Sequence, residues 1–177
     1  MIDDGRPAPL GGILTRATAA DVAEMCVLQR CCWVTEAIIN DTLAIPALHE
    51  DLDTVREWVG SRYVGVVRRG GRLVGAVRGH REGDGWEIGR LMVAPDLVGR
   101  GLGRWLLAHA EAQAPPEVRR FDLFTGSRSE RNLRMYRNAG YAEAPVPVEK
   151  RGVHIVGATF LSKPRDRPGA PGVPARP

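Results

Sequence analysis

A run of glycines and arginines in the middle of the chain has the composition of an anion-binding turn. It is Gly99-Arg100-Gly101-Leu102-Gly103-Arg104. An apolar stretch ending at Pro95 precedes the run and apolar residues at helical spacing follow it, so the run should join a strand to a helix. The N–H groups at a helix start are unpaired and lie beside the positive end of the helix dipole. The glycines would let a ligand approach them closely, and the two arginines would add charge. The run therefore predicts a phosphate-binding turn.

Two familiar phosphate loops fit this turn badly. A nucleoside-triphosphate loop places Lys and then Ser or Thr after its last glycine, whereas Arg104 and Trp105 follow here. A dinucleotide fingerprint needs a third glycine at position 104, which is Arg104. It also belongs to the first strand–helix unit of its domain, and this turn lies in mid-chain. The turn therefore favours neither ATP nor NAD as the ligand whose phosphate it would bind.

The elements around the turn alternate between strand and helix patterns. Strands are predicted at 13–17, 63–68, 73–78, 86–93, 121–125, 141–148 and 153–161. Helices are predicted behind a Thr18–Asp21 capping box, after Asp51 or Asp53, over about 101–113, and from a Ser129 cap to a stop at Gly140. Residues 35–44 give no clear pattern, and Pro46 predicts a break. The order predicts an α/β (α+β) fold with a mixed, mostly antiparallel sheet of six to seven strands flanked by about four helices.

Length and composition indicate one globular domain. The chain has 177 residues, 44% hydrophobic and 26% charged. We expect a flexible segment at 1–12, the folded domain at 13–163 and a disordered, Pro/Arg-rich tail at 164–177. No apolar run has the roughly 18 residues of a membrane span, and no signal peptide is evident. Three closely spaced cysteines form no disulfide framework, so a cytoplasmic location is expected.

The charge distribution argues against a nucleic-acid partner. The formal net charge is +4, and about half of the excess lies in the tail. The body of the domain is therefore nearly balanced, whereas nucleic-acid binding needs a clustered basic face. Oligomeric state cannot be derived from the sequence.

Two sequence blocks, together with the order of elements, resemble the GNAT superfamily of acetyl-CoA-dependent N-acetyltransferases. The first is Val98-Gly99-Arg100-Gly101-Leu102-Gly103, in which Val98 stands where the family usually has Gln or Arg. The second, about 30 residues later, is Asn132-Leu133-Arg134-Met135-Tyr136-Arg137-Asn138-Ala139-Gly140-Tyr141. The resemblance covers about residues 13–161. Homodimers are frequent in this family, so a homodimer is a weak expectation.

The resemblance implies an acetyl-CoA site and no metal. The N–H groups of Gly99, Arg100, Gly101, Leu102, Gly103 and Arg104 would hold the pyrophosphate. Backbone groups of Leu91, Met92 and Val93 would pair with the pantetheine arm as if it were another strand, which is physically reasonable because that arm carries amides. The alternative is that these three side chains are plain core.

Asn132 and Tyr136 share one face of a helix because they are four residues apart. By resemblance, Asn132 would hold the pantetheine and the Tyr136 hydroxyl would protonate the departing thiolate. A phenol of pKa about 10 is protonated at neutral pH and suits a thiolate of pKa about 8.5. The alternative is an amphipathic core tyrosine.

Glu87 lies at the distance before the turn at which some family members have a general base. A base is useful because an alkyl amine of pKa about 10.4 is almost entirely protonated at pH 7. Strand alternation predicts Glu87 on the side of Gly89 and Leu91, opposite Ile88 and Arg90. The alternative is an exposed strand residue paired with an arginine, with a chain of water molecules as the route for the proton.

Acidic and aromatic residues between positions 33 and 53 are candidates for the acceptor site. Trp33 and Glu36, and also Glu50, Asp51 and Asp53, could face a cationic amine. They could equally be core, caps and solvated faces. None of the four histidines (His49, His80, His109 and His154) has metal-ligand spacing, and the cysteines are read as small buried hydrophobes.

The predicted function is acetyl transfer from acetyl-CoA to an amine acceptor by direct attack. We expect a small-molecule amine, because no binding module is appended to the domain. The alternatives are a protein or peptide N-acetyltransferase, a CoA-binding sensor without catalysis, and a nucleotide-binding module.

Overall fold

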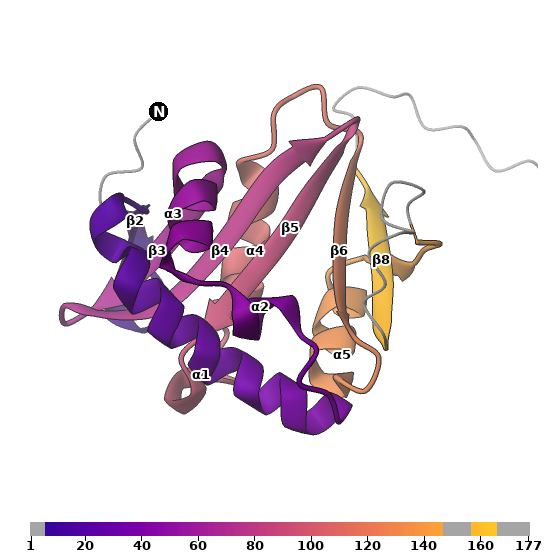
Figure 1. Ribbon diagram of the computed structural model, residues 1–177. Coiled ribbons are helices and arrows are strands. Elements are labelled where there is room, and N and C mark those ends of the chain that lie inside the picture. Colours follow the sequence, from indigo (N-terminus) through magenta and orange to yellow (C-terminus); the bar gives the residue numbers. More distant parts are fainter. Residues whose placement is uncertain (1–5, 147–156, 166–177) are drawn as a thin grey trace, which may run out of the picture.

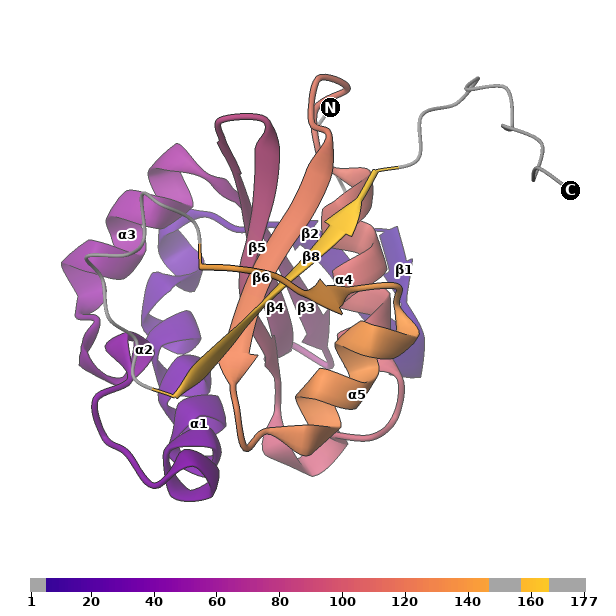
Figure 2. The same cartoon turned by 90° about the vertical axis from the view of Figure 1, so that its right-hand side faces the viewer.

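The computed structural model describes residues 6–146 and 157–165. One twisted sheet runs through it, with helices on both faces (Figure 1). Helices α1, α2 and α3 cover one face, and α4 and α5 cover the other (Figure 2). These two faces are called the α1 face and the α4 face below. The mixed α/β fold with a mostly antiparallel sheet is confirmed.

Within those residues there are eight strands and five α-helices. The strands are β1 Arg6–Ala8, β2 Gly12–Arg16, β3 Tyr63–Arg69, β4 Arg72–Glu82, β5 Gly85–Val93, β6 Arg120–Gly126, β7 Ala142–Glu143 and β8 Ala158–Pro164. The helices are α1 Val22–Asn40, α2 Pro46–His49, α3 Leu52–Ser61, α4 Leu102–Ala112 and α5 Glu130–Asn138. Short 3-10 turns lie at Pro9–Gly11, Ala19–Asp21 and Pro95–Leu97. No helix in the described ranges is long and apolar enough to cross a bilayer.

The sheet has the order β1-β2-β3-β4-β5-β6-β8-β7, and its parallel pair is β5 with β6. That pairing covers only Gly85–Glu87 against Arg120–Asp122. Beyond Glu87 the two strands separate, and Figure 1 shows the gap between their ribbons widening downward. The remaining backbone of β5 on this side is therefore outside the sheet ladder.

Apolar residues from both faces hold the helices to the sheet. Leu106 and Leu107 of α4 are 0% and 1% exposed, and Met25 of α1 and Val55 of α3 are equally buried. Trp86 of β5 ties the sheet to α4, because its indole Nε1 donates to the Ala110 carbonyl at 3.0 Å.

Two of the three predicted caps are made by side chains, whereas Ser129 is the N-cap of α5 but its hydroxyl donates to Glu36 and makes no capping bond. Thr18 and Asp21 form the capping box: the Thr18 backbone N–H donates to Asp21 Oδ2 at 2.8 Å. Of the two proposed caps for α3, Asp51 is the one used; it accepts from the Thr54 backbone N–H at 2.8 Å. Capping fixes where each helix starts and hence which residues face the sheet.

The structure differs from the sequence expectations at the ends of the sheet. The segment expected to be loose at 1–12 contains β1, which pairs with β2, so the sheet has eight strands instead of six to seven. The strand expected at 141–148 is only Ala142–Glu143 in its described part, and β8 continues to Pro164, one residue into the expected tail. Residues 153–156 of the strand expected at 153–161 lie outside the described residues. These short edge strands lack the apolar alternation that marks the central ones.

The helices also differ in one respect. The unassigned stretch at 35–44 contains the end of α1, which runs to Asn40 and closes on Asp41 in the left-handed conformation (φ 53°). Pro46 does not merely break the chain but occupies the first position of the short helix α2. Proline is well accommodated there because its missing N–H would be unpaired anyway.

We expect Gly79→Ala to lower the free energy of unfolding by about 1–3 kcal/mol. A Cβ at position 79 would lie 2.5 Å from the Trp86 indole, which fills the space over this glycine. Gly60→Ala is the matched control, because Gly60 lies in α3 with nothing within 4 Å of the new Cβ. There the stability should be unchanged or rise by up to about 1 kcal/mol. Urea unfolding followed by circular dichroism measures both, and equal effects of the two changes would contradict this packing.

Candidate active site

A cavity of about 890 Å³ lies where β5 and β6 separate. Its walls come from both strands, from the glycine turn that precedes α4, from α5, and from the C-terminal half of α1 with the segment that leads to α2. The cavity therefore joins elements of both faces of the sheet. A site of this kind can hold one extended ligand and a second molecule that reacts with its end.

The glycine turn forms one end of the cavity. Gly99 and Gly101 have φ values of 85° and 89°, which only glycine adopts without strain, and Gly101 is the N-cap of α4. The Gly101 carbonyl accepts from the Trp105 N–H at 3.1 Å, which starts the helix. Arg100 and Arg104 also line the cavity. The glycine run thus joins β5 to α4 as expected, and anion binding by it stays a prediction.

A β-bulge in β5 forms the middle of the cavity wall. Ala76 pairs with Met92 and Arg78 with Gly89, so Arg90 and Leu91 together stand opposite a single residue of β4. Arg90 has a φ of 49°, which a non-glycine residue rarely adopts. The extra residue changes the side of the sheet to which the following side chains point.

This bulge corrects the expected alternation. Glu87 and Gly89 do share the α1 face, where both lie near Arg78. Arg90, expected on the opposite side, instead reaches Glu50 on the α1 face. Leu91, expected beside Glu87, instead lies 3.7 Å from the position of a Cβ on Gly103, at the start of α4. A strict period of two assumes a regular ladder, and the inserted residue breaks it.

Tyr136 and Asn132 lie on the cavity side of α5, as their spacing predicts. Asn132 Nδ2 donates to Glu36 Oε1 at 3.1 Å, and the Ser129 hydroxyl donates to Glu36 Oε2. Glu36 on α1 thus bonds to two residues at the start of α5. Burial raises the pKa of Tyr136 above its ordinary value, and the negative charge of Glu36 acts in the same direction. The phenol is therefore protonated at neutral pH and can donate a proton.

Glu87 lies beside the cavity without lining it. It is 7% exposed, and its Oε1 is 3.5 Å from Nη2 of Arg78. The next two residues, Ile88 and Gly89, do line the cavity.

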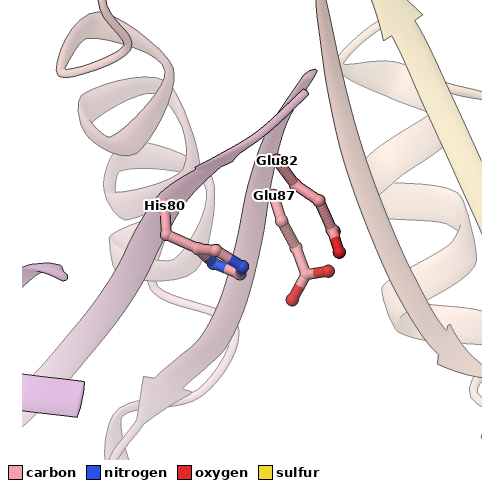
Figure 3. A group of neighbouring side chains, drawn as sticks. All are labelled: His80, Glu82 and Glu87. Carbon is pink, nitrogen blue, oxygen red and sulfur yellow. The ribbon is translucent and has the colours of Figure 1, made fainter. Parts of the chain in front are cut away.

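Glu87 belongs to a polar cluster with His80 and Glu82 of β4 (Figure 3). His80 is the cross-strand partner of Glu87, and one ligand-type atom from each of the three residues lies within 4.8 Å of the others. The sequence analysis did not identify this cluster, because its residues are brought together by the pairing of two strands and not by their spacing along the chain. Such a cluster can hold a cation or a proton, but a metal cation would compete with Arg78 for Glu87. That no metal is bound remains a prediction.

Comparison with known families settles what kind of domain carries this cavity. The model of the acetyltransferase (GNAT) family matches residues 24–141, about two thirds of the chain. The chain belongs to the GNAT acetyltransferase family. The resemblance inferred from the two sequence blocks is thereby confirmed. A search of curated proteins found no match.

Solved structures share this GNAT fold at low sequence identity. An N-acetyltransferase (PaiA) from Thermoplasma acidophilum, solved with coenzyme A, has a TM-score of 0.73 at 11% identity, over 88% of this chain and 100% of that one. The ribosomal-protein-S18-alanine N-acetyltransferase of Escherichia coli has a TM-score of 0.65 at 16% identity, over 89% and 96%. The N-acetylglutamate synthase of Neisseria gonorrhoeae, solved with coenzyme A and N-acetyl-glutamate, has a TM-score of 0.70 at 18% identity, over 88% and 35%. At these identities the likeness concerns the fold.

Most of the residues expected to form the GNAT site do line the cavity. They are Trp33, Glu36, Leu91, Val93, Gly99, Arg100, Gly101, Gly103, Arg104, Asn132 and Tyr136. Met92 and Leu102 do not line it; both side chains are buried in the core at 0% and 1% exposure. Only their backbone groups could contact a ligand. Glu87 lies behind the wall.

The acids that were candidates for the acceptor cleft have different partners. Glu50 accepts from Arg90 Nε at 3.1 Å and from Gln29 Nε2 at 2.8 Å. Burial, the largest single influence, would raise the pKa of Glu50, but the hydrogen bonds and charge of Arg90, the hydrogen bond from Gln29 and the charge of Arg78 together lower it. Asp51 is the cap of α3, and Asp53 pairs with Arg56 at the surface. Glu36 is thus the acid of this group that lines the cavity within the described residues.

Two arginines of the site were missed by sequence reasoning. Arg90 lines the cavity and lies 5.7 Å from the centre of the Trp33 ring, while Arg78 is buried beside Glu87. Both stand within apolar strand patterns, where an arginine is unexpected. A charged residue in such a run was the available signal, because burying an arginine is costly unless a partner or ligand is present. The cavity also contains Cys32; burial raises the pKa of this thiol to about 11, so it is a poor nucleophile.

Proposed function

We propose that this chain transfers the acetyl group of acetyl-CoA to an amine by direct attack. One observation carries the proposal: a single cavity connects the anion-binding turn to Tyr136 through the gap between β5 and β6. An acetyl-CoA molecule needs an anion site at its pyrophosphate and an extended slot for its pantetheine. It also needs a reactive end that a second substrate can reach. The glycine turn, the unpaired part of β5 and the wall at Tyr136 support these three roles in that order.

The cosubstrate would lie along the part of β5 that leaves the sheet ladder. Its pyrophosphate would accept hydrogen bonds from the N–H groups of residues 99–104, with Arg100 and Arg104 adding charge. Its pantetheine amides would pair with the backbone of residues 91–93, since β6 has moved away there. Asn132, which lines the cavity from α5, would hold the pantetheine from the other side.

The chemistry then requires few protein groups. The neutral amine attacks the thioester carbonyl, and a tetrahedral oxyanion forms near the backbone of the bulge at Arg90 and Leu91, where N–H groups stand outside the regular ladder. The carbon–sulfur bond breaks, and the leaving thiolate takes the proton of Tyr136. The nitrogen of the tetrahedral intermediate gives up its remaining extra proton, which returns through water to the tyrosinate and restores the phenol. The raised pKa of the buried phenol keeps that proton in place until the thiolate forms.

Glu87 would accept the proton that the acceptor ammonium must lose. Because Glu87 stands behind Ile88 and Gly89, one water molecule would carry the proton to it. His80 and Glu82 would pass the proton on toward solvent, since they belong to the same cluster and are less buried.

The acceptor we favour is a small molecule. It would enter from the α1 face, where Trp33 and Glu36 line the cavity. The structural neighbours do not decide this point, because their names cover both a ribosomal protein and glutamate as acceptors. The protein would act as a monomer or a homodimer, without nucleic acid.

Calorimetric titration with acetyl-CoA, ATP and NAD distinguishes the classes of function. We expect acetyl-CoA to bind and the two nucleotides to bind at least about 100-fold more weakly, because the turn lacks the features of their loops. Release of free CoA thiol is then followed across a panel of amines. Binding without thiol release from any amine would indicate a sensor, and preferential binding of ATP or NAD would overturn the proposal.

We expect Tyr136→Phe to keep the affinity for acetyl-CoA and to lower turnover by about 100-fold, the usual effect of removing one acid–base group. Tyr141→Phe is the matched control. Tyr141 packs edge-on against Tyr136 at 6.1 Å, and its hydroxyl donates to Glu111 away from the cavity. Its loss should leave turnover close to that of the wild type. Steady-state and single-turnover measurements decide, and an unchanged chemical step in Tyr136→Phe excludes it as the acid.

We expect Glu87→Gln to remove or shift the rise of kcat/KM with increasing pH. The wild-type rise would report formation of the ionised base, and the amide cannot accept a proton. Glu117→Gln is the matched control and should retain the rise, because Glu117 is exposed and belongs neither to the cavity wall nor to this cluster. An unaltered profile in Glu87→Gln would mean that water alone removes the proton.

A further inference from the structure

Four arginines line the cavity without a partner in the described part of the chain. Arg100 and Arg104 come from the glycine turn and the start of α4, and Arg131 and Arg134 come from α5. All four residues are exposed. None of their guanidinium groups makes an ion pair or a hydrogen bond with another described residue. Cations that gather on one cavity wall and have no protein partner favour an anionic ligand.

Other charged groups at the cavity and beside the turn are already engaged. Arg90 donates to Glu50 at 3.1 Å, and Glu36 accepts hydrogen bonds from two residues at the start of α5. Asp96, just before the turn, accepts from both terminal nitrogens of Arg72 at 2.7 and 2.9 Å. These acids are therefore not placed to neutralise the four arginines, and within the described residues that charge is left for a ligand.

The arginine pair of α5 lies next to the glycine turn. Met135 of α5 packs on the start of α4, because its Sδ is 3.5 Å from the position of a Cβ on Gly103. Arg134 directly precedes Met135, and Arg131 lies one helical turn before it on the same side of the helix. The two arginine pairs are thus brought together by the contact between α5 and the start of α4.

Arg131 also lies close to the strand that leads into the turn. Burial raises the pKa of the Cys32 thiol, and the charge of Arg131 opposes that rise, so the two side chains are within electrostatic range. The Sγ of Cys32 donates to the Val93 carbonyl at 3.3 Å, at the last residue of β5. The charge of Arg131 therefore acts at the end of the cavity where β5 gives way to the turn.

One phosphate group does not account for two arginine pairs. Acetyl-CoA carries a pyrophosphate and, on the adjoining ribose, a 3′-phosphate monoester. The proposed site uses Arg100 and Arg104 for the pyrophosphate. A phosphate monoester carries about 1.5 to 2 negative charges at neutral pH and is bound well by guanidinium groups. A second arginine pair beside the first matches a second phosphate beside the first.

We propose that Arg131 and Arg134 bind the 3′-phosphate of CoA and make the site selective for CoA over dephospho-CoA, which lacks this group. The proposal deepens the proposed acetyl transfer and rests on it. The acceptor is a less suitable source of the anion, because α5 lies beside α4, on the opposite face of the sheet from the helix that carries Trp33 (Figure 2).

Calorimetric titration of the full chain with CoA and with dephospho-CoA tests the proposal. We expect CoA to bind about 10-fold more tightly, the low end of the range for charge-assisted hydrogen bonds, because water competes for both exposed arginines. The difference should shrink as the salt concentration rises, since exposed charges are screened.

The double variant Arg131→Gln/Arg134→Gln should bind CoA about 10-fold more weakly and dephospho-CoA as the wild type does. Its KM for acetyl-CoA should rise by a similar factor with kcat unchanged, because the contact is the same in the ground state and the transition state. Arg128→Gln/Arg137→Gln is the matched control. It removes the same charge from exposed positions just before and within α5 that do not line the cavity, so the preference for CoA should persist.

The outcomes are distinguishable. Equal affinity of the wild type for the two ligands would overturn the inference and leave acetyl transfer standing. A preference for CoA that survives in Arg131→Gln/Arg134→Gln would also overturn it, because the 3′-phosphate would then bind elsewhere. An equal loss for both ligands would assign the pair to the pyrophosphate, and a change confined to KM of the amine would assign it to the acceptor; both results contradict the inference. Failure of the wild type to bind either ligand would overturn the proposed function itself.

Discussion

The separation of β5 from β6 is the constraint on which the rest of the site depends. The strands pair over Gly85–Glu87 and Arg120–Asp122, and then part. Backbone groups that leave a sheet must find other partners, because unpaired ones are costly when buried. A ligand that carries amides can provide those partners. The gap therefore explains the cavity, the position of Tyr136 at its wall and the preference for an extended cosubstrate.

The bulge in β5 adapts this gap to two substrates. One inserted residue sends Leu91 to the α4 face and Arg90 to the α1 face. The strand thus presents an apolar side chain where the cosubstrate would lie and a cation where the acceptor would enter. Arg90 is held in its rare conformation by Glu50, which Gln29 supports in turn. Strain at one residue is compensated by the hydrogen bonds that surround it.

Sequence patterns predicted the fold well and placed the glycine turn and the Asn132–Tyr136 pair on the cavity wall, but they did not predict the contacts between distant segments. The glycine turn and the Asn132–Tyr136 spacing are local features, so they can be recognised along the chain. The Thr18–Asp21 and Asp51 caps were local too. Glu36 meeting Ser129, His80 meeting Glu87 and Arg78 facing Gly89 all depend on pairing between distant segments. The bulge at Arg90 cannot be recognised from the sequence, because period-two alternation assumes that no residue is inserted. Edge strands as short as β1 and β7 contain too few residues to show any periodicity.

Glu36 has a consequence for how the two substrates influence each other. It lies on α1, on one face of the sheet, and accepts from Ser129 and Asn132 at the start of α5, on the other face (Figure 2). A molecule that displaces Asn132 from Glu36 also releases a carboxylate toward the other half of the cavity. Free-energy coupling between two sites is reciprocal. If the first substrate changes the affinity for the second by some factor, the second changes the affinity for the first by the same factor. Through Glu36, binding of a molecule in one half of the cavity would therefore change the affinity of the other half for its own ligand.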